Sequence, residues 1–158
     1  MNQLVNAPQQ LASFVDSLLI PIVGTTLLLP VSAVSEVLDD IQLQTEDNLP
    51  GWLYGTAVWR EHQLPVICYE ALVGAEKPAI GEQSRLAVLK AADENSPFEF
   101  YGLVTQGYPR SARVTPTSDF RAQGNQSDES GVLMYATLDD QAVIMPDLAD
   151  MERRLQQR

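Results

Sequence analysis

The residues best suited to nucleophilic catalysis are His62 and Cys68, the only histidine and the only cysteine in the chain. On one extended strand the two would lie roughly 20 Å apart, and a turn between them would bring them closer. Neither arrangement supplies the third group of a catalytic triad or a Gly-x-Ser-x-Gly elbow. We therefore predict that Cys68 is a small buried apolar residue, that His62 is a solvent-facing turn residue, and that the chain has no catalytic residue.

The sequence also offers few residues that could bind a metal or a cofactor. One cysteine and one histidine cannot form an intramolecular disulfide or a zinc site built from these residue types. The sequence has no glycine-rich phosphate loop, and its only lysines are Lys77 and Lys90. We expect no metal and no cofactor.

Pairs of carboxylates remain, because a glycosidase dyad has no fixed spacing in sequence. The visible pairs are Asp39-Asp40, Glu46-Asp47 and Asp139-Asp140. Each stands at a predicted helix end or turn, where solvated acids are common. Solvation is the favoured interpretation, and a carboxylate-dependent hydrolase stays as an alternative.

The charge of the chain argues against polyanionic partners. Its 158 residues carry 10 Lys and Arg against 21 Asp and Glu, a net charge of -11, which would repel nucleic acid and anionic lipid headgroups. Arg60 is the first cation in the sequence. The apolar stretch 18–30 is broken by Pro21 and Gly24, so no membrane insertion is expected, and the first ten residues lack the charge of a signal peptide. We predict a cytoplasmic protein.

The elements that would position these residues are mostly short strands. Amphipathic spacing predicts a short helix over 8–18, about two helical turns over 30–38 and a closing helix over 147–155. Alternating and β-branched patterns predict strands over 18–23, 26–29, 52–59, 64–69, 85–90, 98–105, 112–114, 132–137 and 141–145. The strand containing Pro21 should have an edge there. The pattern predicts an all-β protein with two barrel-like halves.

One segment is more specific than these patterns. Residues 50–74 read PGWLYGTAVWREHQLPVICYEALVG, which resembles the signature of the CheW-like domain: Pro and Gly, then Asn-Leu-Arg-Gly, then Pro-Val-Ile-Asp-Leu and a closing Gly. The spacing from Arg60 to Pro65 matches without a gap. Residues 28–37, 101–104 and 137–148 resemble further parts of the family, so the likeness covers about residues 18–150. On this basis we expect a tail over 1–16, a CheW-like domain over 17–152 divided near 75–85, and a helix end over 153–158.

The resemblance implies a fold of two small five-stranded SH3-like barrels and no enzymatic activity. It also implies a coupler that holds the cytoplasmic tip of a methyl-accepting chemoreceptor and the regulatory domain of a CheA-type histidine kinase in one array. The residues that match its partner-binding positions are Arg60, Glu36 and Val34. An ion pair between Arg60 and Glu36 that only fixes the fold is the structural alternative. A small acidic β-barrel adaptor with other protein partners is the functional alternative.

The departures from the signature indicate a divergent branch of the family. They are Val58, Trp59, Glu61, Cys68 and Gln106. Such branches are similar to the accessory couplers of pilus-linked chemosensory systems, which serve twitching motility through type IV pili. For Trp52 and Trp59 we predict packing in the core, since a strand tryptophan is usually mostly buried.

Overall fold

The computed structural model describes residues 14–123 and 131–157. Strands dominate it, which confirms the all-β prediction. The elements in chain order are β1 Val15–Ile22, β2 Thr25–Pro30, the 3-10 helix η1 Val31–Ala33, β3 Val34–Leu38, β4 Leu53–Trp59, β5 His62–Ile67, α2 Tyr69–Leu72, β6 Arg85–Lys90, β7 Phe100–Thr105, β8 Arg110–Val114, β9 Phe120–Ala122, β10 Val132–Leu138, β11 Gln141–Pro146 and α3 Leu148–Gln157.

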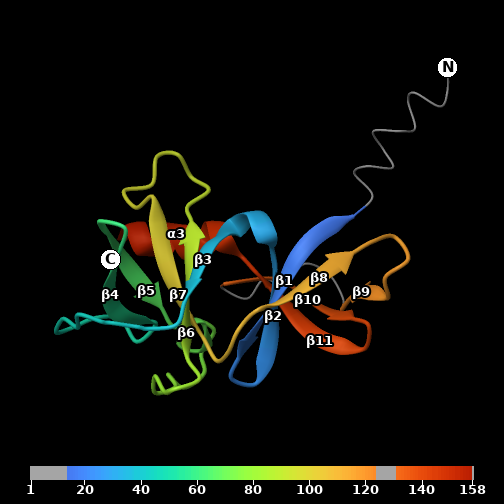
Figure 1. The fold of residues 1–158 in the computed structure, drawn as a ribbon, viewed down its shortest axis with the longest axis horizontal. Helices are drawn as coiled ribbons and strands as arrows, with labels where there is room; N and C mark the ends of the chain where they lie inside the picture. The colour runs from blue at the N-terminus through green and yellow to red at the C-terminus, as the bar shows by residue number, and fades with distance from the viewer. Residues whose placement is uncertain (1–13, 124–130, 158) are drawn as a thin grey trace.

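The strands form two sheets that lie side by side (Figure 1). One sheet has the order β8-β1-β2-β11-β10-β9 and the other has the order β3-β6-β7-β5-β4. Strand pairs are antiparallel except β2 with β11 and β5 with β7. The chain crosses from the first sheet to the second through η1 and returns between β7 and β8. The first two strands therefore pair with the C-terminal part of the chain.

The first hairpin forms where the sequence predicts it, and its turn lies one residue earlier than expected, at residues 23–24. Gly24 adopts a φ of +86°, a conformation that favours glycine. Pro21 pairs with Thr26 of β2, whereas the pairing of β1 with β8 ends at Leu19. Pro21 has no N–H to continue the β8 ladder, and on that side it offers only its carbonyl oxygen, which accepts the N–H of Gln106 at 2.8 Å.

Two helix predictions are wrong in the described residues. Val34–Leu38 is a strand that pairs with β6, and only Val31–Ala33 is helical. Val15 and Leu18, which were assigned to an N-terminal helix, lie in β1, and residues 8–13 of that prediction lie outside the described part of the chain. Valine spacing compatible with a helix is overridden here because β-branched residues pack well on a pleated sheet.

The five-stranded sheet curls so that its two edge strands approach each other. The segment between β3 and β4 pairs Gln44 with Thr56 through two backbone hydrogen bonds of 2.8 and 2.9 Å. Gly55 allows this approach, because a Cβ at this position would lie 2.3 Å from the carbonyl oxygen of Gln44. This closure brings β3 and the end of β4 to one rim of the barrel.

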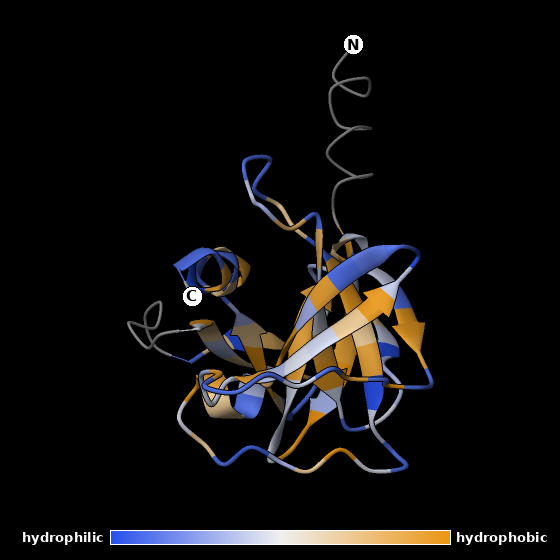
Figure 2. Cartoon of the chain, turned by 90° about the vertical axis from the view of Figure 1, so that its left-hand side faces the viewer, coloured by the Kyte–Doolittle hydropathy of each residue, from blue (hydrophilic) through white to orange (hydrophobic). Residues whose placement is uncertain are grey.

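The main hydrophobic core lies between the sheets. It contains residues from both, including Ile20, Leu27, Ile67 and Leu103, together with Met151 and Leu155 from α3. Figure 2 shows the hydrophobic residues concentrated in the strands, with the hydrophobic side of α3 turned toward them. Trp52 packs against this core, and Trp59 is 7% exposed in a smaller cluster, as predicted.

Within the described residues, no helix is long and apolar enough to cross a membrane.

Candidate partner-binding site

The tip of the β4–β5 hairpin is a two-residue turn formed by Arg60 and Glu61. Trp59 pairs with His62, and the two turn residues have φ angles of 45° and 69°. Positive φ at both central positions is the signature of the type I′ turn, which matches the twist of the flanking strands. The signature glycine is replaced by Glu61, so this chain holds a side chain in a conformation that glycine adopts more readily.

Glu36 reaches the hairpin tip from β3, on the opposite edge of the same sheet. It pairs with Val88 of β6, and the register shifts between Val34 and Glu36. A bulge of this kind changes the direction of the side chains around it. The Glu36 side chain is 37% exposed, and its carboxylate lies beside Trp59 and Arg60.

Two groups contact the same carboxylate oxygen. The indole Nε1 of Trp59 donates a hydrogen bond to Oε2 of Glu36. The Nη2 atom of Arg60 lies 3.8 Å from that oxygen, within ion-pair range but beyond a hydrogen bond. The Arg60 guanidinium lies 4.9 Å from the centre of the Trp59 ring, and the Arg60 side chain is 70% exposed. The predicted contact between Arg60 and Glu36 is therefore present, with Trp59 as a third member.

His62 differs from its prediction. It is the first residue of β5 and is half-buried. Its ring stacks on Trp59 with 6.0 Å between centroids and meets Phe100 edge-on at 4.9 Å. The type I′ turn is two residues long, so it ends before His62 and places this side chain over the rim of the barrel. His62 thus packs against the Trp59 side of the site.

Val34, the third predicted binding residue, is half-buried at the start of β3 and packs against the main core.

Cys68 is fully buried, as predicted, with its Sγ 3.7 Å from Oε1 of Glu70. Burial raises the pKa of the Cys68 thiol, which disfavours the reactive thiolate. The structure therefore brings together Arg60 and Glu36, and it keeps Cys68 away from solvent.

The acid pairs have separate surroundings. Asp139 and Asp140 form the turn between β10 and β11, with φ angles of 49° and 66°. Glu46 and Asp47 are exposed in the segment before β4. Asp39 follows β3 and lies 3.4 Å from the Nε of Arg85, so this pair stands after a strand and not at the end of the predicted helix. In the described ranges, no group of three or more His, Cys, Asp or Glu side chains is placed to hold a metal ion.

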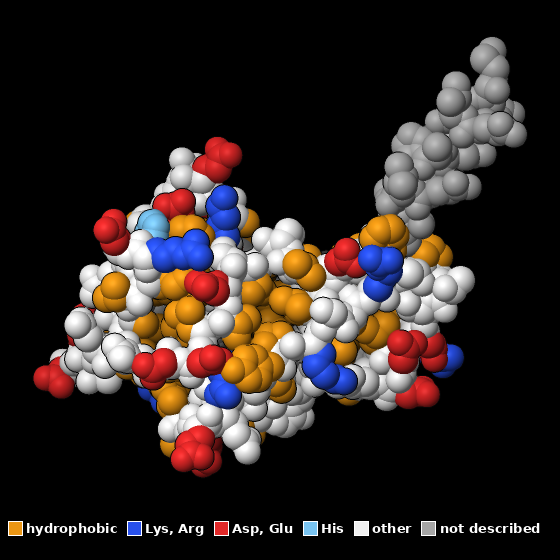
Figure 3. Space-filling model, viewed as in Figure 1, with side chains coloured by type: hydrophobic (Ala, Val, Ile, Leu, Met, Phe, Trp, Pro, Cys, Tyr) orange, Lys and Arg blue, Asp and Glu red, His pale blue; other side chains and the backbone are white. Residues whose placement is uncertain are grey.

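Sequence reasoning missed a second charged and aromatic contact, on the segment that returns from β7 to β8. Tyr108 is 56% exposed, donates a hydrogen bond to Asp39 and lies under the Arg85 guanidinium at 4.4 Å. Figure 3 shows hydrophobic side chains exposed along the middle of this face of the molecule, with charged side chains around them. No local pattern signals this contact, because its members are far apart in sequence.

An apolar groove opens in the six-stranded sheet. Its volume is about 270 Å³, and its lining consists of Val15, Ser17, Leu28, Leu29, Pro30, Val114, Phe120 and Met145. Part of this lining comes from β9, a three-residue strand in a stretch that the sequence analysis left without an element. The groove and the Arg60–Glu36 contact belong to different sheets.

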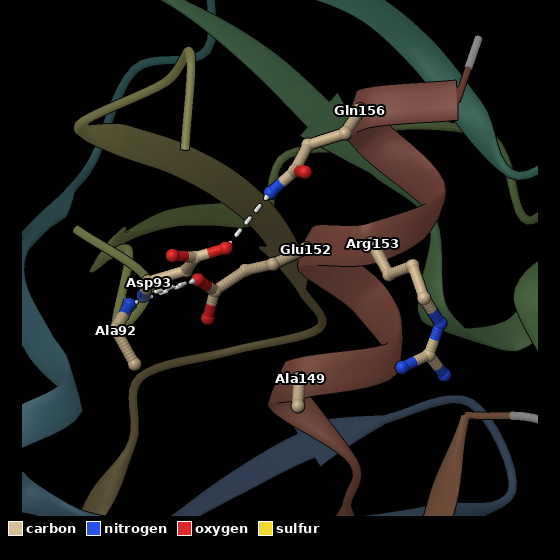
Figure 4. Close-up of a pocket in the computed structure, with 6 residues that line it drawn as sticks. All are labelled: Ala92, Asp93, Ala149, Glu152, Arg153 and Gln156. Carbon is tan, nitrogen blue, oxygen red and sulfur yellow. Dashed lines mark hydrogen bonds between the residues drawn. The ribbon is translucent and has the colours of Figure 1, made fainter. Parts of the chain in front are cut away.

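A larger hollow, of about 510 Å³, lies between α3 and the loop after β6 (Figure 4). Glu152 points from α3 toward this loop, and its Oε1 accepts backbone N–H groups of Ala92 and Asp93 at 2.9 and 3.0 Å. The side-chain amide of Gln156 donates to Asp93 from the next turn of the helix. The carboxylate of Glu152 is thus used to fasten the loop to the helix.

Two β-sheets packed around a shared core define a small β-rich protein with two barrel-like halves. The CheW-like domain model matches residues 16–155, and the chain belongs to that family. Among solved structures, the chain is similar to the scaffolding protein TtCheW from Thermoanaerobacter tengcongensis, with a TM-score of 0.69 and 18% identity over 85% of this chain and 84% of that one. That likeness supports the fold. A search of curated proteins found no match.

Proposed function

We propose that this protein is a non-enzymatic cytoplasmic adaptor of a chemotaxis-type signalling system. It couples the cytoplasmic tip of a methyl-accepting chemoreceptor to the regulatory domain of a CheA-type histidine kinase. Membership of the CheW-like family supports this role. The divergent signature, with Val58, Trp59 and Glu61, supports a place in pilus-mediated motility signalling.

The observation that carries the proposal is the exposed guanidinium of Arg60 at the hairpin tip. The Arg60 side chain is 70% exposed, and it contacts Glu36 through the 3.8 Å ion pair and the Trp59 ring 4.9 Å away, so its N–H donors are available to a partner. An exposed pair of this kind contributes about 0–1 kcal/mol to stability, which is little reason for a purely structural role. Arg60, Glu36 and Val34 are the proposed binding residues.

Two separate surfaces suit a protein with two partners. The Arg60–Glu36 contact lies on the five-stranded sheet, and the apolar groove lies in the six-stranded sheet. A polar, charged surface favours specificity, whereas an apolar groove favours burial of a hydrophobic side chain. An adaptor with other protein partners would use the same surfaces, and the experiment below separates the two possibilities.

The test is the charge reversal Arg60→Glu, measured as binding to the kinase regulatory domain and to the receptor tip. We expect affinity for at least one partner to fall by about 30-fold, the size of a 2 kcal/mol hot spot, with the melting temperature nearly unchanged. Arg153→Glu is the matched control: Arg153 is 60% exposed and paired with Asp150, and it lies on α3, outside both proposed surfaces. It makes the same change in net charge.

Unchanged binding of Arg60→Glu to both partners, at moderate salt, would remove Arg60 from the site. Absence of wild-type binding to either partner would favour the adaptor with other partners. A double-mutant cycle with Glu36→Arg measures how much of the Arg60 effect passes through the ion pair, because a swapped pair should be partly rescued.

A further inference from the structure

Trp59 has a buried N–H group with one partner. The residue is 7% exposed, and its indole donates to Oε2 of Glu36. A buried tryptophan N–H that loses its acceptor costs free energy, so burial of the ring and the hydrogen bond support each other. Stacking with His62 and edge contact with Phe100 hold the ring in place.

The contact of Glu36 with Trp59 is stronger than its contact with Arg60. A hydrogen bond to a carboxylate is directional and charge-assisted, whereas an ion pair of 3.8 Å between exposed groups is weak and screened by salt. Both contacts fall on Oε2, and among the described residues nothing binds the second oxygen, Oε1. Trp59 therefore sets the position of the carboxylate.

Resting on the proposed function, we infer that Trp59 is a positioning residue for the binding site. By holding Glu36, it prevents the carboxylate from closing onto Arg60 in a hydrogen-bonded pair. One acceptor, Oε1 of Glu36, and the donors of Arg60 are then presented side by side to solvent. The partner surface that fits has the complementary pair: a carboxylate that faces Arg60 and an N–H donor that faces Glu36.

This arrangement depends on a departure from the family signature. Trp59 stands where the family signature has leucine, and leucine has no donor for Glu36. In a chain with leucine at this position, Arg60 would be the remaining neighbour to hold the carboxylate. With tryptophan at this position, Trp59 rather than Arg60 holds the Glu36 carboxylate in place.

The test combines binding with a direct readout of the indole. Trp59→Phe removes the N–H donor and keeps an aromatic ring, whereas Glu36→Gln removes the charge. We expect each single variant to weaken partner binding by about tenfold, and the double variant to be no weaker than Glu36→Gln alone, because Trp59 acts through Glu36. Trp52→Phe, at the other tryptophan, is the control and should bind normally.

The indole readout needs no partner. The full-length chain has two tryptophans, so its ¹H–¹⁵N spectrum contains two indole signals, which Trp52→Phe assigns. We expect Glu36→Gln to shift the Trp59 signal upfield and to leave the Trp52 signal in place, because the charged acceptor is lost.

Additive losses of affinity in the double variant, or an unmoved Trp59 signal in Glu36→Gln, would overturn this inference while leaving the proposed function intact. Absence of wild-type binding to either partner would instead overturn the proposed function and the complementary partner surface, and the indole signal would still decide whether Trp59 holds Glu36. If Trp59→Phe does not fold, the shift in Glu36→Gln and its loss of affinity remain decisive.

Discussion

Removing the carboxylate of Glu152 should loosen the C-terminal helix from the loop after β6. Glu152 is 3% exposed, and its two bonds to the N–H groups of Ala92 and Asp93 are 2.9 and 3.0 Å long. A hydrogen bond to a charged group contributes about 1.5–3 kcal/mol net, so the two together contribute about 3–6 kcal/mol. Water can enter the adjoining hollow of about 510 Å³ and accept hydrogen bonds from the N–H groups that lose Glu152. This lowers the expected cost of Glu152→Ala to about 2–4 kcal/mol.

The assay is urea unfolding followed by far-ultraviolet circular dichroism, with thermal unfolding as a second measurement. For a chain of this length a loss of about 2–4 kcal/mol lowers the melting temperature by roughly 4–16 °C. Glu152→Gln should lose about half as much free energy, since the amide oxygen still accepts hydrogen bonds. Glu99→Ala, an exposed change near the same loop, is the control and should stay within about 0.5 kcal/mol of wild type. A Glu152→Ala variant as stable as the control would refute the reasoning.

Two further predictions concern the hairpin tip and the alkaline stability. Glu61→Gly should raise the free energy of unfolding by up to about 1 kcal/mol in urea titrations, because glycine adopts the φ of 69° without strain. Glu61→Ala should not raise it, because alanine has the same strained backbone as glutamate. A glycine variant that is less stable than wild type would contradict this prediction. Burial and the nearby charge of Glu152 raise the pKa of Tyr101 above its ordinary value of about 10. Above pH 10 the unfolded chain loses this proton and the folded chain keeps it, so stability falls by up to about 1.4 kcal/mol per pH unit. Tyr101→Phe should flatten that slope, and an equal slope in both proteins would argue against the assignment.

The sequence by itself determined the elements that depend on neighbours in the chain. The β1–β2, β4–β5 and β10–β11 hairpins all lie where turn residues separate two apolar runs, and β6 matches its prediction residue for residue. The spacing from Arg60 to Pro65 was enough to indicate the family, which the family comparison confirms. Local turn chemistry and side-chain alternation are properties of a short segment, so a short segment reveals them.

Tertiary structure decided the elements whose local signal was ambiguous. The valines of residues 31–38 fit a helix and a strand equally well in spacing, and pairing with β6 selected the strand for Val34–Leu38. β9 has only three residues and an otherwise polar neighbourhood, and it exists because β10 offers a free edge. Such strands depend on partners that no local window contains.

The binding site also combines residues that the sequence singled out with a contact that only the tertiary structure creates. The charge pattern and the family signature singled out Arg60 and Glu36, but the sequence assigned Trp59 only to the core. Its second role requires Glu36 to lie beside it, 23 residues away along the chain and on the opposite edge of the sheet. Closure of the barrel makes that contact, because Gly55 lets the Gln44 segment approach β4 and brings the two edges to one rim. A hydrogen bond between residues joined only by barrel closure is a property of the folded chain, since it depends on distances that sequence order does not fix.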